Sequence, residues 1–436
     1  MLAGFAAADI TPPVGAPLNG FIARTSPSTG VDAALSARAL WIEECGVTCL
    51  VISLDVLGLS PAGADRLVRA LSVSLGIPED HVVLASTHTH SGPMTVSLRG
   101  LGPADEAYVQ FLESQTLKAA SHAASAKRPA KLHWGTAPVS ISINRRQVVP
   151  EDGTVVLGRN PEGPTDTWVR VMHLRGGDAP IVLFEHACHP YCIGGDCNVI
   201  SPDFWGHAAA ALAADGYNVI YMNGCAGNLA PQMAHGGPKA ARETGRRLAD
   251  AVMEACRRLR SDPDPTITVR SRRVQLPHDA PPSLAEVERD LDKADRTVRD
   301  EERTDPVVRE HLRAAWAEWL SELKRMMSQR AGLPPLDARV SVARIGRGAI
   351  VALPGEIFYE IGERIARRLV ADPACVAAYC HGYVGYVPAP ESYAQGGYEV
   401  DESHRYVGLW RVSPHAASLL EDCVFDLWKE CGGELR

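Results

Sequence analysis

The sequence has no excess of positive charge, because 44 lysines and arginines stand against 52 acidic residues, giving a formal net charge of −8 at pH 7. This balance argues against nucleic acid as the main partner. The lack of basic runs and basic amphipathic helices likewise argues against binding to a membrane surface. No apolar run approaches the ~20 residues that a membrane-spanning helix needs.

Signals for export and for cysteine-based metal sites are also missing. The first five residues contain neither the charged start nor the long apolar run of a signal peptide, so we expect a cytoplasmic protein. The 11 cysteines are then expected to be reduced thiols or ligands rather than a disulfide framework. Cys188, Cys192 and Cys197 lie near one another, but they lack the Cys-x-x-Cys spacing of a structural zinc or iron–sulfur site.

What is present is the composition of a globular protein, with 46% hydrophobic and 22% charged residues, which suffices to bury a large core. Apolar runs typical of strands alternate with helical patterns. This alternation favours an α/β fold with a mixed sheet core and flanking helices. We expect one domain over residues 1–436. The main helices are predicted at 64–75, 107–126, 204–214, 239–260, 356–369 and 414–428.

The composition changes at residue 262, where two charged, helix-favouring segments follow at about 283–301 and 305–330. In the second segment, large apolar residues recur at helical spacing, which indicates packing rather than a cofactor site. These residues are Leu312, Trp316, Trp319, Leu320, Leu323 and Met327. We therefore expect a helical hairpin inserted at about 280–332. The hairpin either caps the site or mediates formation of a homo-oligomer, and the sequence leaves both readings open.

The segment Ser-Thr-His-Thr-His-Ser-Gly-Pro at 86–93 follows a short apolar run of strand type. Because side chains alternate along a strand, His88 and His90 are expected to point to the same side. One imidazole could ligate a metal while the other handles protons, since histidine titrates near neutral pH. Two ordinary histidines at a strand end are the alternative.

Other strand ends carry residues of the same chemical type, namely His189, Glu356 and Tyr386. Functional groups in α/β folds gather in the loops at strand ends. Two neutral imidazoles and a carboxylate, with one position left open, are typical ligands of a catalytic zinc. Glu356 could instead be an acidic residue in the first turn of a helix, which the helix dipole favours.

Several motifs follow one another in a fixed order along nearly the whole chain. They are Ala-Asp-Ile-Thr-Pro-Pro at 8–13, Thr-His-Thr-His-Ser-Gly-Pro at 87–93, Asn144-Arg145, His189-Pro190, Ser-Pro-Asp at 201–203, Pro-Gly-Glu at 354–356, and Tyr-Val-Pro at 386–388 through Tyr393 to Tyr398-Glu399. In this order they resemble the catalytic domain of the neutral (non-lysosomal) ceramidase family. The motifs at 87–93 and 386–399 are the most specific.

The resemblance implies one Zn²⁺ held by His88, His189, Glu356 and Tyr386. It further places His90, Arg145 and Tyr398 around the substrate carbonyl. A cation favours the phenolate form of a tyrosine ligand. Arginine stays protonated and can stabilise an oxyanion. Without the resemblance, Arg145 would be expected in a surface ion pair and Tyr398 in a packed loop.

The chain also departs from the family pattern. The family's Gly-Asp-Val-Ser-Pro-Asn segment is Gly-Asn-Leu-Ala-Pro-Gln at 227–232, so Ala230 stands where a serine with a proposed catalytic role is expected. We also expect no trailing immunoglobulin-like domain and no export, both of which ceramidases often have. We therefore expect a small, relatively polar substrate rather than ceramide, and no membrane partner.

The resulting hypothesis is a zinc-dependent hydrolase that cleaves the amide bond of a small acylated amine through a metal-bound hydroxide. An ester or lactone hydrolase with the same metal is the near alternative. A pseudoenzyme that binds a metal or ligand without catalysis is the alternative from another class, and Ala230 favours it. Cys225 as a substitute nucleophile is disfavoured, because no neighbouring residue in sequence would lower its pKa.

Overall fold

The computed structural model of the chain describes residues 1–263, 265–300, 305–329 and 333–436. Its central element is a mixed sheet formed by β1 (Leu2–Asp9), β3 (Ser36–Glu44), β4 (Val47–Leu54), β5 (Val82–Ser86), β6 (Arg128–Pro138), β9 (Trp168–Gly176), β10 (Ile181–His186), β12 (Asn218–Asn223) and β14 (Arg260–Asp262). The strand order is β12-β10-β9-β6-β1-β3-β4-β5, with β14 paired to β6. The pairs β4–β5 and β10–β12 are parallel, and the other pairs are antiparallel.

A second sheet lies on one face of the first and contains β15 (Ile267–Leu276), β16 (Leu336–Ile345), β17 (Gly348–Ala352) and β19 (Ala374–Ala377). The two sheets pack face to face through a buried apolar layer, in which Ile42 and Val51 meet Ile350. The indole of Trp134 in β6 donates a hydrogen bond to the Ile345 carbonyl in β16 at 3.2 Å. Strands covered on both faces must be apolar along their whole length, which explains the continuous apolar runs in the sequence.

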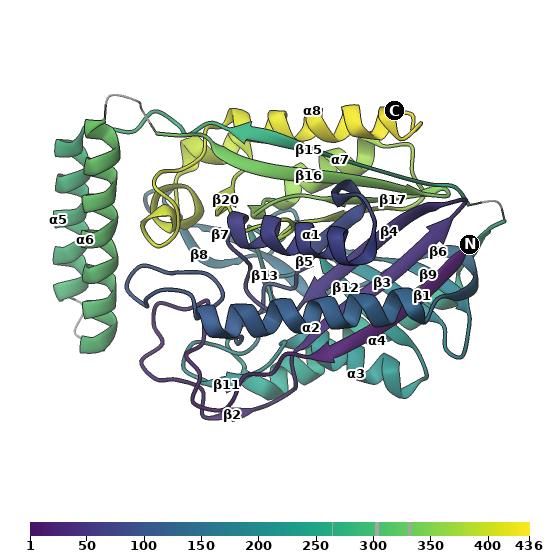
Figure 1. Ribbon diagram of the computed structural model, residues 1–436. Coiled ribbons are helices and arrows are strands. Elements are labelled where there is room, and N and C mark those ends of the chain that lie inside the picture. Colours follow the sequence, from purple (N-terminus) through teal and green to yellow (C-terminus); the bar gives the residue numbers. More distant parts are fainter. Residues whose placement is uncertain (264, 301–304, 330–332) are drawn as a thin grey trace.

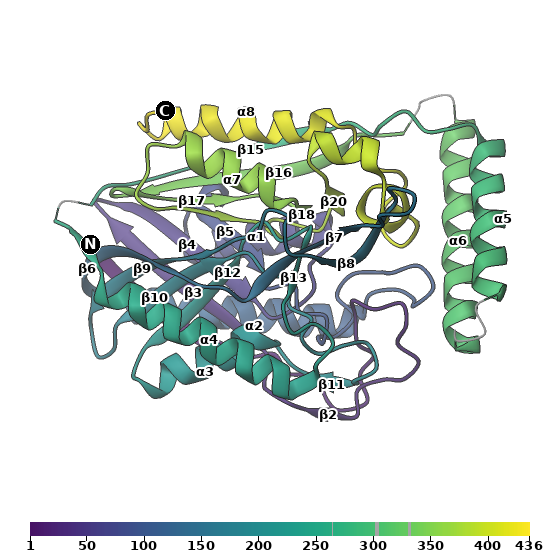
Figure 2. The same cartoon turned by 180° about the vertical axis from the view of Figure 1, so that it is seen from behind.

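Helices cover the two outer faces of this pair of sheets (Figures 1 and 2). The outer face of the first sheet packs against α1 (Pro61–Leu75), α2 (Glu106–Ser125), α3 (Phe204–Ala214) and α4 (Gly237–Arg257). The outer face of the second sheet packs against α7 (Tyr359–Arg368) and α8 (His415–Glu430). The order of layers is therefore helices, sheet, sheet, helices. This arrangement confirms the α/β fold with a mixed sheet core and flanking helices.

Local sequence explains where the helices begin and end. In α1 the Ser60 side chain accepts a hydrogen bond from the Gly63 amide, Pro61 occupies the first turn, and Gly76 ends the helix in the left-handed conformation. The helix predicted at 356–369 begins later, at Tyr359, because Glu356 and Ile357 form the short strand β18 (Glu356–Ile357). This finding removes the alternative in which Glu356 belongs to the first turn of a helix.

The inserted segment between β15 and β16 forms α5 (Leu284–Asp300) and α6 (Pro306–Ser328), which lie side by side at one end of the molecule (Figures 1 and 2). Trp319 and Leu323 of α6 pack with Val287 of α5 and with Trp410. The Trp319 indole donates to the Leu409 carbonyl at 2.6 Å. Residues 301–304 and 330–332 of the predicted hairpin lie outside the described residues. Whether the chain is one domain, and whether the hairpin mediates oligomer formation, stay predictions.

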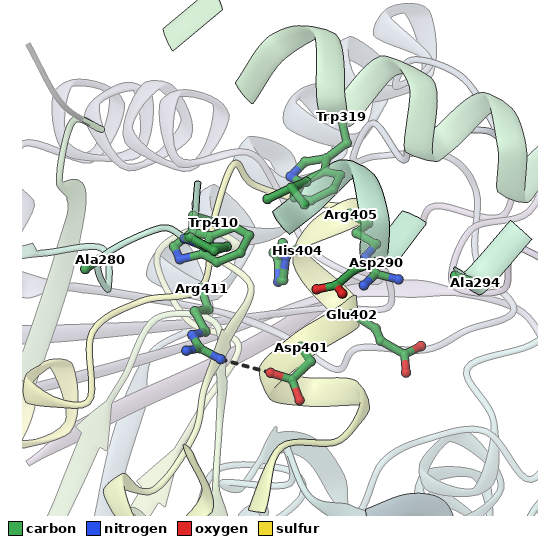
Figure 3. A pocket seen from close by; sticks show the side chains of 12 residues that line it. Ala280, Asp290, Ala294, Trp319, Asp401, Glu402, His404, Arg405, Trp410 and Arg411 are labelled. Carbon is green, nitrogen blue, oxygen red and sulfur yellow. Dashed lines mark hydrogen bonds and ion pairs between the residues drawn. The ribbon is translucent and has the colours of Figure 1, made fainter. Parts of the chain in front are cut away.

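A cavity of about 640 Å³ is lined by residues of the hairpin and of the segment 401–411, beside the contact between Trp319 and Trp410 (Figure 3). Trp319, His404 and Trp410 line it, and an ion pair between Arg411 and Asp401 crosses one side. None of the predicted metal ligands lines this cavity. It therefore lies apart from the predicted chemistry despite its size.

The remaining elements are short strands and short helical turns. They are β2 (Gly30–Val31), which pairs with β11 (Val199–Ile200); β7 (Ser142–Val148), which pairs with β8 (Val155–Asn160) and β13 (Leu229–Pro231); β20 (Tyr386–Val387), which pairs with β18; and the short helical turns η1 (Glu79–His81), η2 (Pro390–Gln395), η3 (Tyr398–Glu402) and η4 (Ser403–Arg405). Among the described residues, no helix is long and apolar enough to cross a membrane.

Candidate metal centre

His88 and His90 lie in the loop that follows β5, which ends at Ser86. His88 adopts a left-handed backbone conformation with φ of 67°. The two rings therefore approach each other because of this loop conformation. The prediction that they share one side because side chains alternate along a strand was wrong about the cause, since both residues lie after the end of the strand. The Nδ1 atom of His88 lies 2.8 Å from the Leu57 carbonyl oxygen, which fixes the ring orientation and leaves Nε2 facing inward.

His189 comes from the loop after β10 and meets both histidines. Its Nε2 atom lies 3.1 Å from Nε2 of His88 and 3.1 Å from Nε2 of His90. Its Nδ1 atom lies 3.0 Å from the Ala226 carbonyl oxygen. A ring that donates its Nδ1 proton to a carbonyl presents the Nε2 lone pair, which is the form in which histidine binds metals.

Glu356 and Tyr386 are neighbours because they form a parallel pair between β18 and β20. Oε2 of Glu356 lies 3.3 Å from Nε2 of His88 and 3.5 Å from Nε2 of His189. This oxygen is buried and has no hydrogen-bond partner among the described residues. The other oxygen, Oε1, accepts a hydrogen bond from the Tyr383 hydroxyl. One carboxylate oxygen is thus fixed, while the second faces the histidines.

Arg145 in β7 connects Tyr386 to a buried carboxylate. Its Nη2 donates to the Tyr386 hydroxyl at 2.9 Å, and its Nε donates to Oε1 of Glu399 at 2.9 Å. Arg146 donates to the second oxygen, Oε2, of Glu399 at 2.8 Å. Arg145 is therefore not a surface residue, since only 5% of its side chain is exposed. The ring of Tyr398 lies 6.0 Å from the ring of Tyr386.

Burial and neighbouring charges set the protonation of this group. Burial lowers the pKa values of His90 and His189 well below their usual range, and the charges of Arg145 and His88 add to the effect. Burial alone would raise the pKa of Glu356, but His88, Arg145 and Tyr383 outweigh it and the pKa lies below its usual value. Burial raises the pKa of Tyr386 well above its usual range, and Arg145 opposes this shift.

These features match what a divalent cation requires. Nitrogen atoms of His88, His90 and His189 lie within 4.8 Å of one another. Neutral imidazoles and a carboxylate oxygen without a partner form a typical zinc ligand set, although other transition metals share these preferences. A nearby cation would also satisfy the buried Oε2 of Glu356 and favour the phenolate of Tyr386. The residues therefore fit a metal, and its identity stays a prediction.

Two cavities border the candidate metal centre. The smaller, of about 110 Å³, is lined by His88, His90, Glu356, Tyr386 and Tyr398 together with apolar side chains. The larger, of about 510 Å³, is also lined by His90, Tyr386 and Tyr398, and further by Arg145 and Ala230. The structure thus brings all seven predicted site residues together, and Ala230 in β13 borders the same space. Their individual roles stay predictions.

The geometry argues against a cysteine acting as the nucleophile or as a metal ligand. Cys225 is 2% exposed and lines a different cavity, of about 320 Å³, which none of the seven predicted site residues lines. Burial raises the pKa of its thiol well above the usual range, which keeps the thiol protonated and unreactive. Within the described residues, the metal-type grouping consists of the three histidines and contains no cysteine.

Two residues that complete the site were not predicted from the sequence. Tyr383 donates to Glu356, and Glu399 binds Arg145 and Arg146. Both lie within or next to the tyrosine-rich motif 386–399, and Glu399 directly follows Tyr398. Two adjacent arginines that are both buried need a carboxylate nearby to balance their charge. The pair Arg145-Arg146 was therefore the signal in the sequence that pointed to a residue such as Glu399.

The sequence and the structure were compared with those of known proteins. No protein-family model matches the sequence, and no curated protein matches it significantly. Among solved structures, a ceramidase in complex with C2 superposes with a TM-score of 0.74 at 18% identity, covering 100% of this chain and 76% of the other. The chain has the neutral ceramidase fold. The neutral ceramidase from Pseudomonas aeruginosa gives a TM-score of 0.71 at 18% identity, with 100% and 75% coverage.

This agreement confirms the ceramidase resemblance at the level of the fold. The superposition covers 100% of this chain, so the similarity concerns the fold as a whole rather than a single element. At 18% identity the comparison carries no activity with it. Function must therefore be argued from the residues of this chain.

Proposed function

We propose that the protein is a zinc-dependent hydrolase that cleaves the amide bond of a small, relatively polar acylated amine. The observation that carries the proposal is that the Nε2 atoms of His88 and His189 converge with one unpartnered, buried carboxylate oxygen, while Nε2 of His90 lies next to them, beside two cavities. The ceramidase fold supports hydrolysis of an amide, because the structural neighbours bear the name ceramidase.

In this proposal His88, His189, Glu356 and Tyr386 hold the metal. When bound, zinc would polarise the substrate carbonyl and lower the pKa of water to about 7. The carbonyl oxygens of Leu57 and Ala226 keep the ligand rings of His88 and His189 oriented.

The remaining polar groups of the site serve proton transfer and charge stabilisation. His90 is neutral, and its Nε2 can accept a proton from the attacking water and return it to the leaving amine. Tyr398 and Arg145 stabilise the negative charge that develops on the carbonyl oxygen. Glu399 fixes the guanidinium of Arg145 for that role.

Ala230 does not prevent this chemistry. Its side chain has no nucleophilic atom, yet it borders the larger cavity together with Arg145 and Tyr386. Attack by water activated at the centre needs no serine. An ester or lactone would meet the same groups and is the alternative substrate class, which the screen below includes.

The test is a hydrolysis screen of the purified protein, loaded with zinc, on N-acyl amines and matched esters of graded polarity. We expect cleavage of short acyl amides, loss of cleavage with a chelator, and negligible turnover of long-chain ceramide. Metal binding without cleavage of any amide or ester would support the pseudoenzyme instead. Robust ceramide cleavage would contradict the proposed substrate class.

A further inference from the structure

The two cavities beside the candidate metal centre differ in size and in lining. The smaller one, about 110 Å³, is closed by apolar residues such as Ile22, Leu57 and Leu98. A cavity of about 150 Å³ suffices for benzene, so this one accepts only a shorter apolar group. The larger cavity, about 510 Å³, must take the other part of the substrate.

The larger cavity carries positive charge and no described carboxylate in its lining. Arg145 lies on one side of it and Arg159 of β8 on another. Arg145 and Arg146 share the single carboxylate of Glu399, which leaves a net charge of +1 (2 − 1) before Arg159 is added. A cavity with walls of one sign concentrates ligands of the opposite sign.

Arg159 is held in place without being neutralised. Its Nη1 donates to the Gln232 carbonyl at 2.7 Å, and its backbone amide donates to the Gln147 side chain at 2.9 Å. Arg247 approaches Gln232 as well, with its Nη2 3.4 Å from the side-chain oxygen. No described carboxylate forms an ion pair with Arg159 or Arg247. The guanidinium of Arg159 therefore keeps donors for a ligand, and its planar fork matches a carboxylate.

We propose that Arg159 selects substrates whose larger arm ends in an anionic group, a carboxylate in the first instance. This inference rests on the proposed function and names its substrate class: an acylated amine with one short apolar arm and one longer anionic arm. The amide lies between the two cavities, where both border His90, Tyr386 and Tyr398.

The experiment uses matched substrates that differ only in charge. N-butyryl-ω-amino acids with two to six methylenes are compared with the corresponding terminal amides, and the reversed amides, in which propylamine is linked to a dicarboxylate, form a second series. Variants are Arg159→Gln, Arg159→Lys and the control Arg128→Gln. Arg128 is a suitable control because it is exposed and, among the described residues, its side chain donates only to the backbone carbonyl of Lys127, at 2.9 Å.

We expect kcat/KM for the carboxylate in one series to exceed that for its amide by about tenfold, the size of a charge-assisted contact in a partly exposed site. This ratio should approach one in Arg159→Gln, persist in Arg159→Lys and in Arg128→Gln, and decrease in 0.5 M NaCl because salt screens exposed charges. A ratio of one for every linker in the wild type, or a preference unchanged in Arg159→Gln, would overturn the inference.

Calorimetric titration of the same carboxylates into chelator-treated protein separates this inference from the proposed function. Binding that depends on Arg159, without cleavage after metal loading, supports the anion site and contradicts the hydrolase. Equal cleavage of charged and neutral substrates supports the hydrolase and contradicts the anion site. Carboxylate binding equal to amide binding in the wild type also contradicts the anion site.

Discussion

Glu399→Gln tests how the site is held together, because one buried carboxylate serves two arginines. Glu399 accepts from Arg145 at 2.9 Å and from Arg146 at 2.8 Å, and its side chain is 1% exposed. Glutamine keeps the size of the side chain but removes the charge. The substitution therefore leaves two guanidinium groups buried without a counter-charge.

The expected cost follows from the burial of this group. Removing one partner of a buried ion pair costs about 3–5 kcal/mol, and glutamine retains one acceptor oxygen, so we expect about 3 kcal/mol. With an unfolding entropy of about 2.1 cal/mol/K per residue, a chain of 436 residues should show a decrease in Tm of about 3 °C. Because Arg145 loses its fixed orientation, kcat should fall between about tenfold and 10²-fold.

Glu185→Gln is the matched control. Glu185 is also buried and accepts from Arg170 at 3.0 Å, but Arg170 keeps Asp166 as a second partner. Burial raises the pKa of Glu185 although Arg170 opposes the shift, so neutralising this side chain removes less stabilisation than neutralising Glu399. We expect a loss below about 1 kcal/mol and an unchanged kcat. Urea denaturation and steady-state kinetics measure both variants. Equal effects of the two substitutions on kcat would refute the role given to Glu399.

Three further substitutions test separate parts of the account. His90→Ala and Tyr398→Phe should each reduce kcat by about 10²–10³, measured on folded protein with unchanged metal content. If either variant keeps activity within about twofold of wild type, that residue has no role in the mechanism. Cys225→Ala should change kcat by less than about twofold, and a trapped acyl group on the protein, seen by intact-mass spectrometry, would contradict attack by water. Gly348→Ala should cost about 1–3 kcal/mol in urea denaturation, because a Cβ would lie 2.3 Å from the Trp134 ring between the sheets, and an unchanged midpoint would refute this packing.

Much of the fold was predictable because the spacing of apolar residues along the sequence shows which face of a helix or strand is buried. The helix predicted at 204–214 matches α3, and α1, α2 and α8 end within a few residues of their predicted bounds. The division of the strands into two stacked sheets was not predictable, since an apolar strand looks the same in either sheet. The apolar, strand-like run at 132–143, for example, reads as one strand in the sequence but covers parts of β6 and β7, which belong to different sheets.

The site was predictable in its residues but not in its geometry. The ordered motifs identified seven side chains that the structure brings together. Six of them line the two cavities, and His189 contacts His88 and His90 beside them. The left-handed conformation of His88 and the pairing of Glu356 with Tyr386 depend on tertiary contacts, so no local pattern reveals them. The link from Glu399 to Arg145 spans 254 positions in sequence, beyond the reach of any periodicity.

The central claim is that a metal binds among these histidines, and anomalous diffraction at the zinc absorption edge tests it most directly. Crystals of the protein loaded with zinc should show one peak at about 2.0–2.1 Å from Nε2 of both His88 and His189, with Glu356 and Tyr386 completing the ligand set. A structure of zinc-loaded protein with no peak among these residues, or with zinc bound by cysteines elsewhere, would contradict the account.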